Sequence, residues 1–301
     1  MNHTTLMKGE PMGFTKLGFS GQRMKYPLNA LFGMVVGEQN TGKSYLFQSN
    51  PDAFIINLDL SSTVTPECRA TIWPGVNEQG LPVDIDNKHL VLTWDKVLEK
   101  KQQLIDMAKA DEPRPKCVVL DTITPCVRLL KPYIAKKMDR SSFEQAHGPA
   151  AYDKLFDEIL SFAFDLRQVG YGVWFIAHLS REFLQVSDDG AKQEELTLNL
   201  SAGMVRRLTP AVEMIAPVCC DRRSTTVMLK KIVKSGSKEI ERKVPTEQII
   251  FDRKLAFDDP RFSRIIRTRT TNRMPNIPLD PVDPWGTFES AFDNANKDND
   301  Q

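Results

Sequence analysis

The feature that most constrains the fold of this chain is a glycine-rich octapeptide that follows a short apolar run. Residues 37–44 read Gly-Glu-Gln-Asn-Thr-Gly-Lys-Ser and match the pattern G-x-x-x-x-G-K-[S/T] at every fixed position. Residues 30–36 before it are apolar, as expected for a buried strand. Gly37 and Gly42 let the backbone turn tightly and approach a phosphate without a Cβ in the way. A strand, a phosphate-binding loop and a helix are therefore predicted in this order.

The remaining residue types of the loop each have a chemical reason. Consecutive N–H groups at the start of a helix hold a phosphate, Lys43 reaches the β- and γ-phosphates, and the Ser44 hydroxyl is a ligand for Mg²⁺. We therefore expect ATP and Mg²⁺ as cofactors. The residues predicted to contact the nucleotide are Gly37, Glu38, Gln39, Asn40, Thr41, Gly42, Lys43, Ser44 and Tyr45.

The rest of the chain predicts an α/β fold with a mostly parallel central sheet flanked by helices. Apolar runs alternate with helical patterns in the first part, whereas strands follow one another in the last third and should add antiparallel edge strands. Predicted strands are 30–36, 53–58, 89–94, 116–121, 171–177, 212–219, 225–233, 239–244 and 263–270, and predicted helices start at 44 and cover 95–110, 126–138 and 152–169. We divide the chain into an irregular N-terminal extension (1–27), an ATPase domain (28–279) and an acidic C-terminal tail (280–301).

Asp121 ends the apolar run Cys-Val-Val-Leu and is the candidate second ligand of the metal ion. A phosphate-binding loop needs a carboxylate at the carboxyl end of a neighbouring strand to hold Mg²⁺ through water. Thr122 could help to position it. The alternative is a capping Asp after an ordinary strand.

Hydrolysis also needs a group that orients or deprotonates the attacking water. Asp59 and His178 each follow a predicted strand, so both should lie at the carboxyl edge of the sheet, where ligands bind in open α/β folds. Asp59 could instead cap the segment after it, and His178 could be a structural histidine.

Taken in order, GEQNTGKS, AFIINLD, KCVVLDT, GVWFIAH and RIIRTRT with NRMPNIP resemble the RecA-like P-loop ATPase core over roughly residues 28–290. The closest likeness is to phage-encoded nucleotide-binding proteins of the recombination and annealing group. In that family a carboxylate, usually Glu, is the catalytic base, and Asp59 takes this position with a side chain one methylene shorter. The resemblance makes His178 a γ-phosphate sensor that acts on a DNA-binding loop at 179–204.

The resemblance also implies rings or filaments with a nucleotide at each subunit interface. Basic residues would then reach across from the neighbouring subunit, and Arg267, Arg269 and Arg273 are the candidates. Arg267 and Arg269 are two residues apart, so they would share one face of a strand. Two exposed strand arginines without this role are the alternative.

The charge distribution is the sequence evidence for nucleic acid. The whole chain has a net charge of only +1, but residues 222–273 hold 15 Lys and Arg against 6 Asp and Glu. Such a segment fits a surface that tracks phosphates, with Lys230 and Lys231 as candidate DNA-binding residues. The alternative is a solvated edge whose lysines prevent strand pairing between molecules.

Composition excludes several classes of protein. With 41% hydrophobic and 26% charged residues, the chain is neither fibrous nor wholly disordered. It has no apolar run long enough for a membrane span and no apolar N-terminal signal. Five cysteines without metal-ligand spacing indicate reduced thiols, and we expect a cytoplasmic protein, in the host if phage-encoded.

Three functions remain. The first is a Mg²⁺-ATP hydrolysing protein that acts on single-stranded DNA in recombination, annealing or replication. The second is an ATP-gated DNA-binding protein with little or no hydrolysis, for which the short Asp59 is the reason. The third is a small-molecule phosphotransferase, which ranks low because the α/β half has no arginine-rich lid.

Overall fold

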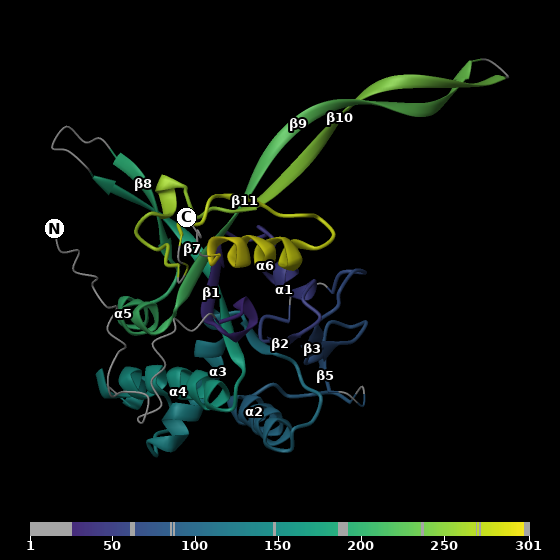
Figure 1. Cartoon of the computed structure of the whole chain (residues 1–301). Helices are drawn as coiled ribbons and strands as arrows, with labels where there is room; N and C mark the ends of the chain where they lie inside the picture. Colours follow the sequence, from purple (N-terminus) through teal and green to yellow (C-terminus); the bar gives the residue numbers. More distant parts are fainter. Residues whose placement is uncertain are drawn as a thin grey trace, which may run out of the picture.

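The computed structural model describes residues 26–60, 64–84, 86, 88–146, 149–185, 192–235, 238–268, 270 and 272–297. Within them a mostly parallel sheet is covered by helices on both faces, so the predicted α/β fold is confirmed (Figure 1). The first 25 residues, most of the predicted N-terminal extension, lie outside the described part.

The elements follow the chain as a strand–helix alternation and then as long strands. The short helical turns are η2 (Leu28–Ala30), η3 (Glu144–Ala146) and η4 (Pro260–Phe262). The helices are α1 (Lys43–Gln48), α2 (Trp94–Lys109), α3 (Ile123–Lys137), α4 (Pro149–Gln168), α5 (Ala202–Ala211) and α6 (Pro284–Ala295). The strands are β1 (Phe32–Gly37), β2 (Ala53–Asn57), β3 (Thr71–Trp73), β4 (Gly75–Val76), β5 (Pro82–Val83), β6 (Cys117–Asp121), β7 (Gly172–Gln185), β8 (Lys192–Leu198), β9 (Met214–Ser235), β10 (Lys238–Leu255) and β11 (Ile277–Pro278).

The strand order places the phosphate-binding loop in the middle of the sheet. The order is β11-β10-β9-β1-β7-β6-β2-β3, and β1 pairs in parallel with both β7 and β9. The register puts Gly37 opposite His178, and Asn57 opposite Asp121. Because parallel strands end at the same edge, residues from three separate strand ends meet beside the loop after β1.

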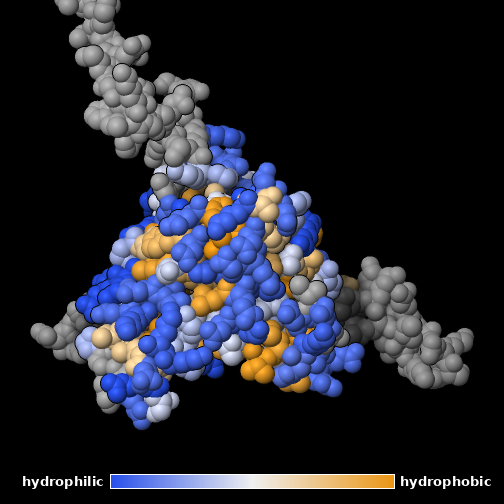
Figure 2. Space-filling view, turned by 90° about the horizontal axis from the view of Figure 1, so that it is seen from below, coloured by the Kyte–Doolittle hydropathy of each residue, from blue (hydrophilic) through white to orange (hydrophobic). Residues whose placement is uncertain are grey.

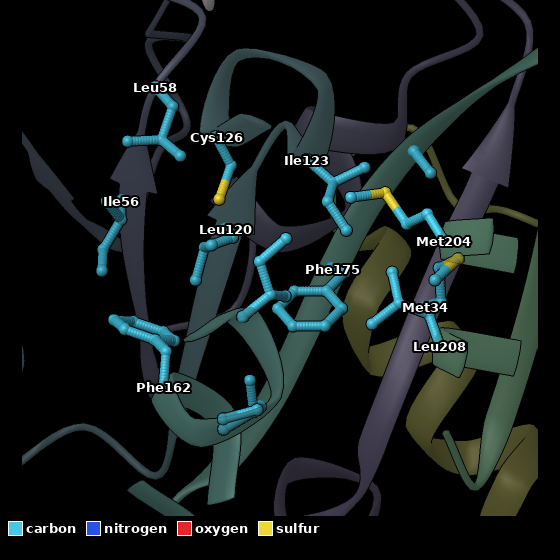
Figure 3. Packing of buried hydrophobic residues seen from close by; sticks show 14 of the residues in the cluster. Met34, Ile56, Leu58, Leu120, Ile123, Cys126, Phe162, Phe175, Met204 and Leu208 are labelled. Carbon is cyan, nitrogen blue, oxygen red and sulfur yellow. The ribbon is translucent and has the colours of Figure 1, made fainter. Parts of the chain in front are cut away.

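Two hydrophobic cores hold the helices on the sheet. One core lies under α2, α3, α4 and α5, and Figure 3 shows part of it, with Met34, Leu120 and Phe175 from the strands against Phe162 and Leu208 from the helices. The other core lies under α1 and α6. The surface seen from below is largely hydrophilic, with hydrophobic residues in separate patches (Figure 2). Among the described helices, none combines the length and the apolarity needed to cross a bilayer.

The antiparallel strands of the last third are longer than the strands predicted from the sequence. β9 spans 22 residues and β10 spans 18, and they pair antiparallel from Val218–Leu255 out to Ser235–Lys238. This two-stranded ribbon, the β9–β10 hairpin, runs far out from the body of the protein (Figure 1). The segment predicted as a loop after His178 also contains strands, because β7 continues to Gln185 and pairs with β8.

Two predicted strands are absent from the described structure at their positions. At 89–94 only His89 forms a bridge, to Val83, and Trp94 already begins α2 because the Thr93 side chain accepts a hydrogen bond from the Lys96 N–H. Residues 263–268 form a turn and an irregular segment with one described bridge, between Arg267 and Ile215.

The predicted acidic C-terminal tail is part of the folded domain as far as it is described. In α6, Trp285, Phe288 and Phe292 are buried in the core beside α1. The backbone N–H of Trp285 also donates a hydrogen bond to the Ser49 hydroxyl at the end of α1, at 3.0 Å. The amphipathic pattern of this helix outweighs its acidic composition, because its apolar side chains need a partner surface.

Candidate functional site

The loop between β1 and α1 takes a shape that only glycine permits at its two fixed positions. A Cβ on Gly37 would lie 2.6 Å from the Val218 carbonyl oxygen, closer than real Cβ atoms approach. Gly42 has φ of +94°, and a Cβ there would lie 2.7 Å from the Arg253 side chain. The predicted strand–loop–helix order is therefore confirmed in its geometry, with Lys43 as the first residue of α1.

Lys43 is held inside the loop by the backbone of Glu38. Its ammonium donates a hydrogen bond to the Glu38 carbonyl oxygen at 2.6 Å, and the Thr41 hydroxyl donates to the same oxygen at 3.0 Å. The Lys43 side chain is buried, and this burial lowers its pKa to about 8, although the carboxylates of Asp121, Asp59 and Glu38 favour its charged form. An anion that enters the loop would favour the charged form of Lys43 further.

Ser44, Asp59, Asp121 and His178 line one cavity of about 360 Å³ together with Lys43. The backbone fixes two of them, because the Asp121 carbonyl oxygen accepts hydrogen bonds from the N–H groups of Leu58 at 2.6 Å and Asp59 at 3.2 Å. Asp121 itself is almost fully buried. The structure thus brings together the predicted phosphate-binding, metal-binding and water-activating candidates from three strand ends.

His178 lies at the centre of this edge. Burial, and then the positive charge of Lys43, lower the pKa of His178, so its imidazole is neutral near pH 7. Its Nδ1 is buried and has no hydrogen-bond partner among the described residues. A neutral imidazole with one uncommitted nitrogen can accept or donate a hydrogen bond to a ligand in the cavity.

The donor set fits a metal ion that arrives with a nucleotide. Among the described residues, no group of three or more His, Cys, Asp or Glu could hold a metal ion by itself. Ser44 and Asp121 nevertheless supply a hydroxyl and a carboxylate to the same cavity, and oxygen donors suit Mg²⁺. Mg²⁺ typically keeps waters and takes its remaining ligands from substrate phosphates.

Arg253 belongs to the site and was not predicted from the sequence. It comes from β10 and lines the same cavity, with its guanidinium carbon 5.9 Å from the centre of the Tyr45 ring. Its Nε is buried, and the part of the chain that the structure describes offers it no hydrogen-bond partner. Thr122 also lines the cavity. No local pattern marks Arg253, since it follows the phosphate-binding loop by some two hundred residues and reaches it only through strand pairing.

Of the three arginines predicted to act across a subunit interface, Arg267 and Arg273 lie outside the cavity. The Arg267 guanidinium donates to the carbonyl oxygens of Thr209 at 2.8 Å, Pro210 at 3.2 Å and Val212 at 3.2 Å, at the end of α5. Arg273 forms an ion pair with Asp258. Arg269 lies outside the described residues. Neither Arg267 nor Arg273 lines the cavity of its own chain. Their action on a neighbouring chain stays a prediction.

The predicted DNA-binding lysines lie far out on the β9–β10 hairpin. Lys230 is in register with Lys243, and Lys231 with Arg242. Their side chains are outside the described part of the structure. Nearer the body, Arg181 at the start of the extended part of β7 pairs with Glu38 of the phosphate-binding loop, with its Nε 2.6 Å from Oε1.

Comparison with known proteins agrees with this geometry. A family model described as "AAA domain" matches residues 30–243, which is most of the chain and includes the loop, Asp59, Asp121 and His178. A search of curated proteins finds no match. The match indicates a P-loop ATPase type of domain, with nucleotide binding and hydrolysis as its general activity.

Proposed function

Because this chain belongs to the AAA domain family, we propose that it is a Mg²⁺-dependent ATPase that acts on single-stranded DNA. The observation that carries the proposal is one cavity lined by Lys43, Ser44, Asp59, Asp121 and His178. These residues supply the phosphate-binding, metal-binding and water-activating groups that one chain contributes to hydrolysis of a phosphoanhydride. The resemblance to RecA-like phage proteins gives the biological setting of the proposal, which is recombination, annealing or replication.

Each residue has a separate task in this proposal. Lys43 binds the β- and γ-phosphates, and Ser44 and Asp121 hold Mg²⁺, which neutralises charge on the phosphates when it is bound. Asp59 accepts a proton from the water that attacks the γ-phosphorus, the bond from that phosphorus to the bridging oxygen breaks, and ADP and phosphate leave. His178 lines the same cavity, and its role in the proposal is to hydrogen-bond the γ-phosphate.

The β9–β10 hairpin supports the DNA part of the proposal. Its register sets Lys230 opposite Lys243 and Lys231 opposite Arg242. Like charges directly opposite each other destabilise an antiparallel pair, so these positions weaken the hairpin unless anions compensate them. A phosphate backbone along the ribbon would provide this compensation and release counterions. The root of the ribbon holds Arg253, which lines the nucleotide cavity and offers a direct link between the two sites.

A second function is favoured by one residue. Asp59 is shorter than the Glu that RecA-like enzymes use as the base, so the protein can also work as an ATP-gated DNA-binding protein with little hydrolysis. In both cases we propose that the protein forms a homo-oligomer in which a neighbouring subunit completes the open side of the γ-phosphate.

The test is phosphate release from Mg²⁺-ATP with and without a single-stranded oligonucleotide, for the wild-type protein and for Lys43→Ala. We expect stimulation by the oligonucleotide and loss of both binding and release in Lys43→Ala. Release that is unaffected by Lys43→Ala would refute the site. DNA binding that depends on ATP without measurable release would favour the gated protein, and a site that binds ATP but no oligonucleotide at low salt would refute the DNA role.

A further inference from the structure

The turn that follows β2 carries Asp59 and is closed at both ends by hydrogen bonds. At its start, the N–H groups of Leu58 and Asp59 donate to the Asp121 carbonyl oxygen at 2.6 and 3.2 Å. At its end, the carboxamide oxygen of Asn57 accepts a hydrogen bond from the Leu60 N–H at 3.1 Å. Asp59 therefore lies inside a short loop that the Asn57 side chain closes.

The backbone of Leu60 has an unfavourable conformation that depends on such a contact. Its φ is +56°, in the left-handed region that a residue with a Cβ rarely adopts. A residue stays in this region only where its surroundings compensate the strain, and the hydrogen bond to Asn57 supplies such compensation. Without this bond we expect Leu60 to leave the left-handed region and Asp59, its neighbour in the chain, to move with it.

Asn57 is the last residue of β2 and is only 1% exposed. Ile56 and Leu58, on either side of it in the chain, belong to the core under α2, α3, α4 and α5 (Figure 3). Because side chains alternate along a strand, Asn57 is on the other face of the sheet, which α1 covers. The register sets Asn57 opposite Asp121, so it belongs to the strand ends that surround the cavity.

The other end of the Asn57 amide is unfavourable for the stability of the fold. Its Nδ2 is buried and meets no hydrogen-bond acceptor among the described residues. A buried donor without a partner lowers stability, whereas an apolar side chain of similar shape would not. The useful part of this side chain is therefore its oxygen, which holds the turn that carries Asp59.

We propose that Asn57 is a positioning residue for hydrolysis, which keeps Leu60 in the left-handed conformation and thereby places the Asp59 carboxylate against the attacking water. This inference rests on the proposed function, in which Asp59 accepts the proton of that water. Asn57 is not among the residues that line the cavity, so it acts through the turn and not on the ligand. A displacement of about 1 Å can lower turnover about 10²-fold, so the turn should affect the rate and leave nucleotide affinity unchanged.

The experiment measures kcat and KM of phosphate release, the Kd of a non-hydrolysable ATP analogue and the urea midpoint of unfolding. The variants are Asn57→Ala, Asn57→Leu and the control Asn50→Ala. Asn50 is a matched control because it is equally buried and its carboxamide oxygen accepts from the Asp52 N–H at 3.0 Å, in the turn before the same strand. Asn57→Leu removes the acceptor and the unpaired donor together, so it should fold even if Asn57→Ala does not.

Both Asn57 variants should lower kcat by about 10- to 100-fold and leave KM and Kd within about twofold of wild type. Asn57→Leu should do so with a urea midpoint at least as high as that of Asn57→Ala. Asn50→Ala should lower the midpoint and keep the kcat of wild type. Adding Leu60→Gly to Asn57→Ala should raise kcat about fivefold or more, because glycine adopts the left-handed conformation without the help of Asn57.

A kcat of Asn57→Leu within about twofold of wild type would overturn the inference, as would an equal loss in Asn50→Ala or no gain from Leu60→Gly. Asp59→Asn separates this failure from that of the proposed function. If Asp59→Asn is inactive while the Asn57 variants are fully active, the proposed hydrolysis stands and only the role of Asn57 is wrong. If wild type releases no phosphate, or Asp59→Asn turns over as wild type does, the role of Asp59 is refuted, and the role of Asn57 with it.

Discussion

The Lys43 ammonium donates its hydrogen bond to the Glu38 carbonyl oxygen, within the loop that is meant to bind phosphate. The loop therefore binds its own lysine through a backbone carbonyl. A nucleotide must draw the ammonium from that carbonyl, and it succeeds only while the lysine is charged. This relationship gives the first prediction.

Nucleotide affinity should decrease as the pH rises through about 8. Burial lowers the pKa of Lys43 to about 8, and bound phosphates favour the ammonium. The affinity is therefore highest at pH values below 8 and decreases above pH 8. The dissociation constant at pH 9 should be about tenfold that at pH 7, measured by titration of a non-hydrolysable ATP analogue. Lys43→Arg is the control, because its guanidinium stays charged and its weaker affinity should not change with pH. An equal affinity of wild type at pH 7 and pH 9 would contradict this assignment.

Asp59→Asn should retain ATP binding and lose hydrolysis. The carboxylate lines the cavity with Lys43, and without it the attacking water loses its proton acceptor, which typically lowers turnover about 10²- to 10⁴-fold. Asp59→Glu should hydrolyse ATP at least as fast as wild type, because it restores the longer reach. Steady-state phosphate release measures both. Full turnover in Asp59→Asn would shift the role to His178, which His178→Gln then tests.

Changing both Lys230 and Lys231 to Ala should weaken single-stranded DNA binding and its salt dependence. Each lost phosphate contact lowers the slope of log affinity against log salt by about 0.7 for a single strand, so the double variant should lose about 1.4. Fluorescence anisotropy across a salt series measures the slope. Changing Lys100 and Lys101 on α2 to Ala removes the same charge from another surface and should leave the slope unchanged. Identical losses in the two double variants would indicate only a general effect of net charge.

Arg267→Ala should lower the free energy of unfolding by about 1 kcal/mol. The guanidinium donates to three carbonyl oxygens at the end of α5, which would lose this donor. Urea unfolding should show a lower midpoint with an unchanged slope. Arg206→Ala, which removes an exposed arginine from α5 itself, is the comparison. An unchanged midpoint would show that the end of α5 does not need this cap.

Turnover per subunit should rise with protein concentration if a neighbouring chain completes the site. A positive group supplied by another subunit can raise turnover by roughly 10³–10⁵. Arg267→Ala mixed with Lys43→Ala should then recover part of the activity, because some interfaces receive both intact residues. Constant turnover over a wide dilution series, with a monomer by light scattering, would show that one chain holds the complete site.

The phosphate-binding loop and the strand ends around it could be predicted from the sequence. The loop depends on local backbone requirements at Gly37 and Gly42, and Asp121 ends a strand whose other residues are apolar. Once the strands are known to be parallel, their carboxyl ends must share one edge of the sheet. For this reason Asp59, Asp121 and His178 could be placed near Lys43 without a structure.

Two features depend on tertiary contacts. These are which distant residues line the cavity, and whether a weak strand pattern becomes a strand. Residues 263–270 have the composition of a strand, but Ile265 and Ile266 pack against the cores from an irregular segment, so packing outweighs β propensity. Arg267 accordingly reaches the end of α5 rather than the cavity. Arg253 enters the cavity because β10 pairs with β9 and β9 with β1, and such long-range pairing depends on contacts that no local stretch of sequence contains.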